Sequence, residues 1–333
     1  MANFISVIIP NRNGEATLEA CLAAAFASRY EPFEVIVVDD GSEDRSVEII
    51  ERFPCRLLRL EAQAGASRAR NLGAAASRGD MLFFTDADCL LQENTLAVAC
   101  AALAAAGRDV VVGGTYTCLP PERSFFSRFQ SVFINYCETK RPERPDYVAT
   151  HAMAMDTEAF RRSGGFAEVF LPILEDVEFS HRLRRAGVRL VMEPALQVRH
   201  LFNFSLRKSL RNALRKSFYW TVYSLGRGDL LADSGTASAE LKLNVAAHAL
   251  AVLLLGLAAL TGEIALLASV PVLVAANLFA SRGLLRALRQ AGGVGFAAAA
   301  ALYYVALYPA AVGAGALAGA LSYLARPPRP GAA

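Results

Sequence analysis

Short apolar runs and longer helix-like segments alternate over the first third of the chain. The runs are rich in β-branched and aromatic residues, and the segments between them carry good helix formers. We expect strands at residues 4–9, 33–38, 56–60 and 81–85, and helices at residues 15–27, 43–53, 66–77 and 93–106. Alternation of this kind predicts an α/β fold with a parallel sheet whose two faces are covered by helices.

The pattern is less regular between residues 109 and 200. Apolar runs predict further strands at residues 110–117, 147–155, 188–191 and 197–200, and residues 175–186 read as a helix. We therefore expect one domain over residues 1–200, with a first half to about residue 115 and a second half over residues 116–200.

A basic, amphipathic segment follows at residues 206–220, within a linker region that we place at residues 201–240. Apolar residues recur in it every four positions, at Leu206, Leu210, Leu214 and Phe218. Basic residues fill positions between them, at Arg207, Lys208, Arg211, Arg215 and Lys216. Such a helix is typical of a membrane interface. The alternative is a helix packed on the domain core with a solvated basic face, and the apolar segments that follow favour the interface.

Long apolar stretches make up residues 241–325. Residues 245–280 carry a single charge, Glu263, and a span needs about 20 apolar residues. Two helices, at about 245–260 and 263–280, with a turn at residues 261–263 therefore fit this stretch. Residues 296–325 are apolar again and are expected to form one tilted helix or a broken pair.

The charges around these stretches predict their orientation. We expect a loop at residues 281–293, and it carries Arg282, Arg286 and Arg289. By the positive-inside rule this loop is cytoplasmic, as is the first domain. The tail, residues 326–333, is also basic and favours a cytoplasmic end. The sequence thus predicts a multi-pass protein of the inner (plasma) membrane whose first domain stays in the cytoplasm.

Composition narrows the function classes. The chain is 54% hydrophobic, and its net charge of +3 is too small to indicate nucleic-acid binding. Its six cysteines lack zinc-site spacing, and no signal peptide is evident, so reduced thiols in a cytosolic domain are expected.

Polar clusters follow three of the predicted strands. Residues 11–13 follow the first strand, residues 39–42 the second, and Asp86 and Asp88 the fourth. Ligands of open α/β sheets bind beyond the carboxyl ends of strands, so the three loops predict one site. Two carboxylates separated by one residue suit a hard divalent cation, Mg²⁺ or Mn²⁺, although a polar turn is the simpler interpretation of the pair.

Six short motifs, in their order and spacing, resemble those of the inverting glycosyltransferase family 2. They are SVIIPNRN at residues 6–13, VVDDGS at 37–42, GASRARNLG at 65–73, TDAD at 85–88, GGF at 164–166, and the pair Glu175 and Asp176. The resemblance covers residues 4–200. It implies the GT-A fold, a Rossmann-like nucleotide-diphospho-sugar transferase domain, with donor and acceptor halves.

The resemblance also implies roles on the donor side. Pro10 and Asn11 would line the nucleotide site, Asp40 would bind the base with Asp39 nearby, and Arg70 would contact the base or phosphates. Asp86 would contact the sugar or ribose and belong to the metal site, and Asp88 would ligate the metal directly. Residues 39–42 can also form a turn and helix cap, in which Ser42 or Asp44 caps and Asp39 and Asp40 stay free, and Arg70 can be a surface arginine.

On the acceptor side, the resemblance implies that Asp176 is the catalytic base and that Glu175 supports the acceptor. Acidic residues also favour helix N-termini for reasons unrelated to catalysis. A histidine at the place of His200 completes the metal site in some members, although a structural role is equally open. Residues 215–220 only loosely match the interface motif of processive members, because the spacing differs.

The sequence thus predicts transfer of a sugar from a nucleotide-diphosphate sugar, with a UDP-sugar the expected donor, to a lipid-linked or membrane-proximal glycan acceptor in cell-envelope synthesis. Membrane lipids are a further expected partner. A polyprenyl-phosphate glycosyltransferase is the alternative enzyme, and an inactive GT-A membrane scaffold is the alternative from another class. The sugar, the acceptor and processivity stay open.

Overall fold

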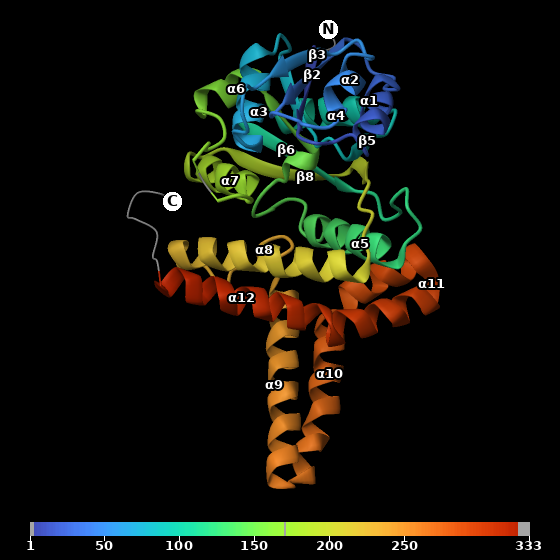
Figure 1. The fold of residues 1–333 in the computed structure, drawn as a ribbon, viewed down its shortest axis with the longest axis vertical. Helices are drawn as coiled ribbons and strands as arrows, with labels where there is room; N and C mark the ends of the chain where they lie inside the picture. Colours follow the sequence, from blue (N-terminus) through green and yellow to red (C-terminus); the bar gives the residue numbers. More distant parts are fainter. Residues whose placement is uncertain (1–2, 170, 326–333) are drawn as a thin grey trace. The chain divides into compact units, whose positions relative to one another are not determined.

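The computed structural model describes residues 3–169 and 171–325, and the basic tail at residues 326–333 lies outside this part. The described chain divides into two units. We call one the sheet unit, which runs to Glu122 and resumes over Glu138–Phe202. The other is the helical unit, which comprises Arg123–Cys137 and the chain from Asn203 onward. Figure 1 shows the elements of both units.

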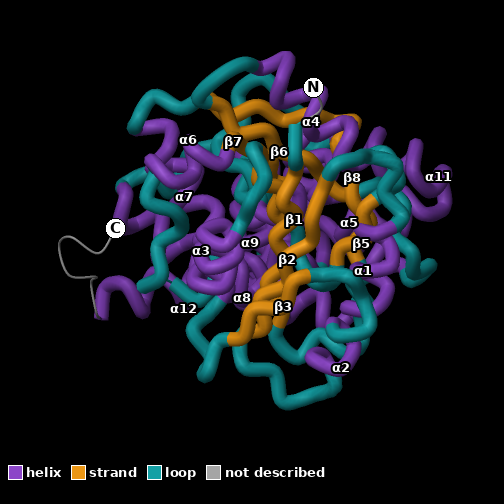
Figure 2. Tube along the Cα trace, turned by 90° about the horizontal axis from the view of Figure 1, so that it is seen from above, coloured by secondary structure: helices purple, strands orange, loops and turns teal. Residues whose placement is uncertain are grey.

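One eight-stranded sheet forms the centre of the sheet unit, with the order β3-β2-β1-β4-β7-β6-β8-β5. Its strands are β1 (Ile5–Asn11), β2 (Phe33–Asp39), β3 (Arg56–Arg59), β4 (Met81–Phe84), β5 (Cys89–Leu91), β6 (Val110–Tyr116), β7 (Met153–Asp156) and β8 (Arg189–His200). Its helices are α1 (Leu18–Phe26), α2 (Ser46–Ile50), α3 (Ala66–Ala76), α4 (Thr95–Ala106), α6 (Thr157–Arg162) and α7 (Glu175–Arg185), with a 3₁₀ turn at Thr150–Ala152. Figure 2 shows β1, β2 and β3 running side by side among these helices.

The parallel order predicted from the first four apolar runs is confirmed. β1 pairs in parallel with both β2 and β4, and β2 pairs in parallel with β3. β1, β2 and β4 are mostly buried because their apolar runs are covered on both faces, whereas the edge strand β3 is partly exposed. Gly73 lets α3 approach closely, since an added Cβ would lie 2.6 Å from Ile8 Cγ2.

The sheet as a whole is mixed, because strands beyond the first four of the expected alternation add antiparallel pairs. β7 is antiparallel to both β4 and β6, and β5 is antiparallel to β8. The two short strands expected at residues 188–191 and 197–200 are one strand, β8. Its register with β6 shifts between Gly113 and Thr115, and this irregularity accommodates Pro194 inside the strand.

The helical unit contains seven helical elements. They are α5 (Phe125–Thr139, whose last two residues belong to the sheet unit), α8 (Leu206–Arg227), α9 (Ala239–Thr261), a 3₁₀ helix (Ile264–Ala268), α10 (Ser269–Ala280), α11 (Arg282–Ala306) and α12 (Tyr308–Ala325). α9 and α10 pair as a hairpin, and α8 and α12 lie side by side and run crosswise to that hairpin (Figure 1). α9 ends at Thr261, and Gly262 takes a left-handed conformation (φ 78°) that opens the expected turn.

One expectation for this unit is wrong. The loop expected at residues 281–293 is the first part of α11, because Leu284 and Leu288 form an apolar stripe that is buried. Of the two alternatives expected for residues 296–325, the structure has the broken pair rather than a single helix, because α11 ends at Ala306 and α12 begins at Tyr308. Gly293 (φ 77°) additionally kinks α11.

α5 was not expected from the sequence, which assigned its residues to the first domain. Its aromatic side chains pack within the helical unit, where Phe129 lies with its ring centroid 4.9 Å from that of Tyr303 and 5.5 Å from that of Tyr308. Phe125 similarly meets Phe296 at 5.5 Å. Residues 123–137 therefore group with the C-terminal helices.

Within the described residues, two helical stretches are long and apolar enough to cross a membrane, Ala239–Thr261 and Arg282–Ala325. The second is the α11–α12 pair and is interrupted as described above. Length and composition alone are weak evidence for a span, but the first stretch is only 11% buried, which an ordinary core helix would not be.

Candidate active site

The loops after β1 and β2 meet at a buried cluster of polar side chains. Asn11 Nδ2 donates to Asp39 Oδ1 at 2.9 Å, and Ser42 Oγ donates to the same oxygen at 2.5 Å. Asn11 and Asp39 are 2% and 3% exposed, so these hydrogen bonds compensate the loss of water. Pro10 precedes Asn11 at the end of β1, opposite Val38. The predicted nucleotide-site residues Pro10, Asn11 and Asp39 therefore lie together.

Asp40 braces the backbone ahead of α3. Its two carboxylate oxygens accept hydrogen bonds from the backbone N–H groups of Ala64 at 2.6 Å and Gly65 at 2.9 Å. Gly65 precedes the first residue of α3 and has φ 93°, a conformation that favours glycine. Asp40 therefore lies at the predicted site, and its carboxylate holds the loop that leads to Arg70.

Arg70 lies at the centre of the site, contrary to the interpretation of a surface arginine. Its side chain is 4% exposed, and its two terminal nitrogens bind Asp86 Oδ1 and Glu175 Oε1, each at 2.7 Å. Burial alone would lower the pKa of the guanidinium, but Asp86 and Glu175 outweigh that effect and raise it. Arg70 therefore remains charged and joins the donor-side and acceptor-side motifs.

Asp88 faces His200 across the edge of β5 and β8. His200 Nε2 lies 3.3 Å from Asp88 Oδ2, and β5 pairs Cys89 directly with His200. Burial would raise the pKa of the Asp88 carboxyl, but the hydrogen bond and charge of His200 hold it below its ordinary value. The His200 ring stacks on Phe202 at 3.9 Å and meets Tyr116 edge-on, so its orientation is fixed.

The donors at this edge fit a divalent cation in part. Potential ligand atoms of Asp88, Cys89 and His200 lie within 4.8 Å of one another. The Cys89 thiol is buried, which, with the nearby Asp88 and Asp86 charges, raises its pKa well above the ordinary value, so it stays protonated. A carboxylate with an imidazole suits Mn²⁺ better than Mg²⁺, which prefers oxygen ligands throughout. Asp86, the other predicted ligand, is instead joined to Arg70.

Glu175 and Asp176 begin α7, as expected for acidic residues at a helix N-terminus. Asp176 Oδ1 accepts a hydrogen bond from the Val177 backbone N–H at 2.8 Å. The preceding residue, Leu174, has φ 76°, a strained conformation for a branched side chain. The start of α7 is therefore held in a specific conformation beside Arg70.

A histidine and a glutamate behind the site were not assigned from the sequence. His151 Nε2 lies 3.4 Å from Glu138 Oε2, and both side chains are buried. Burial lowers the pKa of His151, but Glu138, with smaller contributions from Asp86 and Asp176, more than compensates and raises it. The His151 ring also stacks on Tyr116 at 4.1 Å. Neither His151 nor Glu138 lies in a recognisable motif, so no sequence pattern indicated that they pair.

The GGF motif is held by the side chain of Asn71. Asn71 Nδ2 donates to the Phe166 carbonyl at 2.9 Å, and Asn71 Oδ1 accepts from the Phe166 N–H at 2.8 Å. A Cβ on Gly165 would lie 2.5 Å from Asn71 Oδ1, which explains the glycine. Phe166 packs its ring on Phe84 and Phe179, so the motif ties α3 to the core beneath α7.

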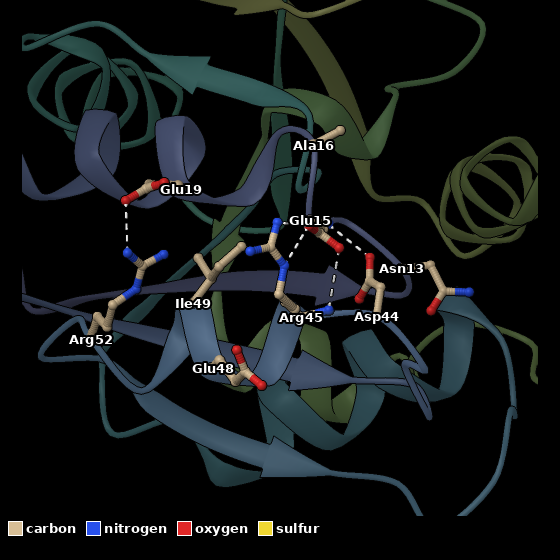
Figure 3. Close-up of a pocket in the computed structure, with 9 residues that line it drawn as sticks. All are labelled: Asn13, Glu15, Ala16, Glu19, Asp44, Arg45, Glu48, Ile49 and Arg52. Carbon is tan, nitrogen blue, oxygen red and sulfur yellow. Dashed lines mark hydrogen bonds and ion pairs between the residues drawn. The ribbon is translucent and has the colours of Figure 1, made fainter.

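A separate polar pocket lies beside the loop after β1 and does not contain the paired carboxylates (Figure 3). It is lined by Asn13, Glu15, Ala16, Glu19, Asp44, Arg45, Glu48, Ile49 and Arg52. Arg45 and Arg52 are paired with Glu15 and Glu19 across it. These charges are satisfied internally, so the pocket offers no chemistry comparable to that of Asp86, Asp88 and Arg70.

Comparison with known proteins agrees with this geometry. The family model described as glycosyl transferase family 2 matches residues 6–164. These residues are a glycosyltransferase family 2 domain. The family resemblance predicted from the motifs is thus confirmed over residues 6–164.

Curated relatives of this family 2 domain match over part of their length. The chain is 30% identical over 131 residues to glycosyltransferase GlyG of Streptococcus pneumoniae, covering 38% of this chain and 44% of that protein. It is 33% identical over 135 residues to glycosyltransferase AglE of Haloferax volcanii, again covering 38% and 44%. The chain therefore spans less than half the length of these relatives.

A solved structure resembles this chain over most of its length. It is the mannosyltransferase PcManGT from Pyrobaculum calidifontis in complex with GDP-Man and Mn²⁺, with a TM-score of 0.60 and 19% identity. The likeness covers 97% of this chain and 88% of that one. At this identity it shows the fold, and the GT-A fold predicted from the sequence is confirmed.

Proposed function

We propose that the protein is an inverting glycosyltransferase that moves a sugar from a nucleotide-diphosphate sugar to an acceptor near a membrane. The observation that carries this proposal is the buried Arg70, which holds Asp86 and Glu175 at 2.7 Å each, next to the Asp88–His200 pair. Donor-side and acceptor-side carboxylates are thereby fixed around one position, as a transfer between two bound substrates requires.

On the donor side, Pro10, Asn11 and Asp39 bind the nucleotide, and Asp40 orients the loop that positions Arg70. Asp88 and His200 hold Mn²⁺ or Mg²⁺, with Asp86 close by. Such a cation, when bound, stabilises the negative charge that develops on the diphosphate leaving group. The sequence favours a UDP-sugar, and the structural neighbour was solved with GDP-Man and Mn²⁺, so both nucleotide classes are candidate donors.

On the acceptor side, Asp176 is the base. Its carboxylate accepts the proton of the acceptor hydroxyl while the hydroxyl oxygen forms a bond to the anomeric carbon. The bond from that carbon to the diphosphate breaks on the opposite face, which inverts the configuration. Glu175 is held by Arg70 and orients the acceptor. The strained Leu174 fixes the backbone from which both carboxylates project.

The helical unit attaches the enzyme to a membrane. The α9–α10 hairpin is apolar and mostly exposed, and the inner membrane, with the sheet unit on the cytoplasmic side, is the proposed location. A lipid-linked or membrane-proximal glycan is then the proposed acceptor, in cell-envelope glycan or glycolipid synthesis. Polyprenyl phosphate is the alternative acceptor, and an inactive scaffold is the alternative from another class.

Hydrolysis and transfer by the purified full chain test the proposal. We expect Mn²⁺-dependent release of UDP or GDP from one nucleotide sugar, and an at least ~100-fold loss in Asp88→Asn. Asp80→Asn is the matched control, because Asp80 precedes the same strand, β4, at its other end and binds the Phe4 backbone. Polyprenyl phosphate and lipid-linked oligosaccharides are then compared as acceptors. Wild-type protein without metal-dependent turnover of any donor would favour the scaffold.

A further inference from the structure

The exposed face of α8 carries basic side chains that form no ion pair among the described residues. Among the described residues, none of these five side chains forms an ion pair, and all are exposed: Arg207, Lys208, Arg211, Arg215 and Lys216. α8 contains no acidic residue. Arg282, Arg286 and Arg289 add an exposed basic row on α11. Charges left unpaired at this density are typical of a surface that meets an anion.

α12, which lies beside α8, has no charged residue at all. Its outward side chains are apolar, with Leu317 63%, Leu321 59% and Leu324 75% exposed. An exposed apolar face of this kind is unfavourable in water and indicates contact with an apolar environment. On α8, Leu206 and Leu214 are likewise 39% and 43% exposed rather than packed in a core.

α8 and α12 are joined by close backbone contact (Figure 1). A Cβ on Gly315 would lie 2.1 Å from Ser217 Oγ and 2.2 Å from the Leu214 carbonyl oxygen. A Cβ on Gly319 would lie 2.5 Å from the Phe218 carbonyl oxygen. α12 therefore cannot cross a hydrocarbon layer without carrying α8 into it. Each arginine or lysine at the centre of a bilayer costs about 2.5–3.5 kcal/mol or more.

The break between α11 and α12 is part of the fold. Pro309 has no N–H, so the carbonyl of Val305 lacks a helical partner, and His248 Nδ1 binds it at 3.2 Å. Asn244 Nδ2 donates to the neighbouring carbonyl, that of Tyr304, at 2.7 Å, and Asn244 Oδ1 accepts from Asn277 Nδ2 at 2.6 Å. Side chains of α9 and α10 thus satisfy the interrupted helix, which stabilises the change of direction before α12.

We propose that α8 and α12 form one layer that lies in the plane of an anionic membrane surface, and that α12 does not span the bilayer. The leucines of α12 and α8 enter the acyl boundary, and the basic residues of α8 and α11 contact lipid phosphates. Only the α9–α10 hairpin, crosswise to this layer, enters the hydrocarbon core. The inference deepens the membrane attachment proposed above and is independent of the transfer chemistry.

The single native tryptophan makes the depth of each helix measurable. In a Trp220→Phe background, a new tryptophan replaces Leu307, which directly precedes α12, Leu317 or Leu324 on α12, or Leu253 on α9, all of which are exposed. Full-length protein in vesicles is quenched with lipids brominated at several acyl positions. We expect the sites at Leu307, Leu317 and Leu324 to be equally shallow and the Leu253 site to be deep. Circular dichroism checks that each variant is folded.

A spanning α12 gives a different pattern. Leu317 near its middle would then be as deep as Leu253, while the two ends stay shallow, because 17 residues of helix rise about 26 Å. That result would overturn the inference and leave the membrane hairpin intact. Shallow or absent quenching at Leu253 as well would contradict the proposed membrane attachment itself. Neither outcome of the quenching experiment depends on transfer activity.

Lipid preference tests the anionic partner. Native Trp220 should be quenched at least about twofold more strongly by brominated phosphatidylglycerol than by brominated phosphatidylcholine at low salt. Arg207→Gln with Arg211→Gln and Arg215→Gln should remove that preference. Arg161→Gln with Arg162→Gln, in α6 of the sheet unit, is the control and should retain it. Equal quenching by both lipids in the wild type would overturn the anionic assignment.

Discussion

The sheet unit encloses its large apolar side chains, whereas the helical unit turns many of them outward. Among the described residues, every large hydrophobic side chain that is exposed lies in the helical unit, apart from Leu119 and Val169. The sheet unit also buries charges in pairs, as at Arg70, while the helical unit leaves five basic side chains of α8, between Arg207 and Lys216, without an ion pair among the described residues. The difference supports the proposal that the helical unit, unlike the sheet unit, contacts lipid.

The buried charges of the sheet unit give the largest expected effect. Arg70→Ala leaves Asp86 and Glu175 without their shared cation, so we expect donor turnover to fall by about 1,000-fold and the free energy of unfolding by roughly 3–5 kcal/mol. Arg68→Ala is the control, since Arg68 lies on the same helix and forms only an exposed pair with Glu168. Kinetics and thermal unfolding measure both. If Arg70→Ala is as stable and active as Arg68→Ala, the buried network is not the centre of the site.

A substitution on the acceptor side of the same network distinguishes a role in catalysis from a role in donor binding. Asp176→Asn should lower transfer by roughly 100- to 10,000-fold, because the acceptor hydroxyl loses its base. The dissociation constant of the donor, measured by titration calorimetry, should change less than about twofold. An equal loss of donor affinity would exclude the base role of Asp176.

The motifs predicted this network only in part. Ordered short motifs fixed the parallel strands and the loops of Asp39, Asp86 and Glu175, because each motif lies within a few residues. They did not reveal that Arg70 is buried, since its partners are 16 and 105 positions away. The β7 and β8 pairings, α5, and the Glu138–His151 pair likewise depend on contacts between segments distant in sequence. Local pattern also missed α11, where three arginines suggested a loop while the buried leucines between them form a helix.

The Glu138–His151 pair gives the sheet unit a pH dependence. The pKa of His151 is raised above its ordinary value, so the protonated form stabilises the fold fully below about pH 6.5, and this contribution is lost as pH rises through the raised pKa. His151→Phe leaves Glu138 buried without its cation, and we expect a cost of about 3 kcal/mol at pH 6 that shrinks at higher pH. Thermal unfolding between pH 6 and 9 measures it.

His181→Gln is the control for that experiment. His181 is also buried, but its partner Asp146 retains Arg184 at 2.5 Å, so a smaller cost is expected. If the stability of the wild type rises from pH 6 to 9, and that of His151→Phe rises with the same slope, the assignment of this pH dependence to His151 is contradicted.

The stability of the helical unit should depend on side-chain volume at the helix contacts rather than on charge pairing. Gly319→Val places side-chain atoms against the Phe218 backbone and should cost about 1–3 kcal/mol in detergent. Gly256→Val on α9 is the matched control, since a Cβ there meets nothing within 4 Å, and it should be within about 0.5 kcal/mol of the wild type. Equal effects of the two changes would mean that α8 and α12 are not in close contact.

The assignment of α5 has a practical consequence for anyone who wants the sugar-transfer domain alone. Its chain leaves the sheet unit at Arg123, contributes an aromatic helix to the other unit, and returns at Glu138. A protein shortened after Phe202 would keep Phe125, Phe129 and Phe133 but lose their ring partners on α11 and α12. We expect such a fragment to aggregate or to require detergent. Soluble expression would need polar replacements on that helix rather than an earlier stop codon.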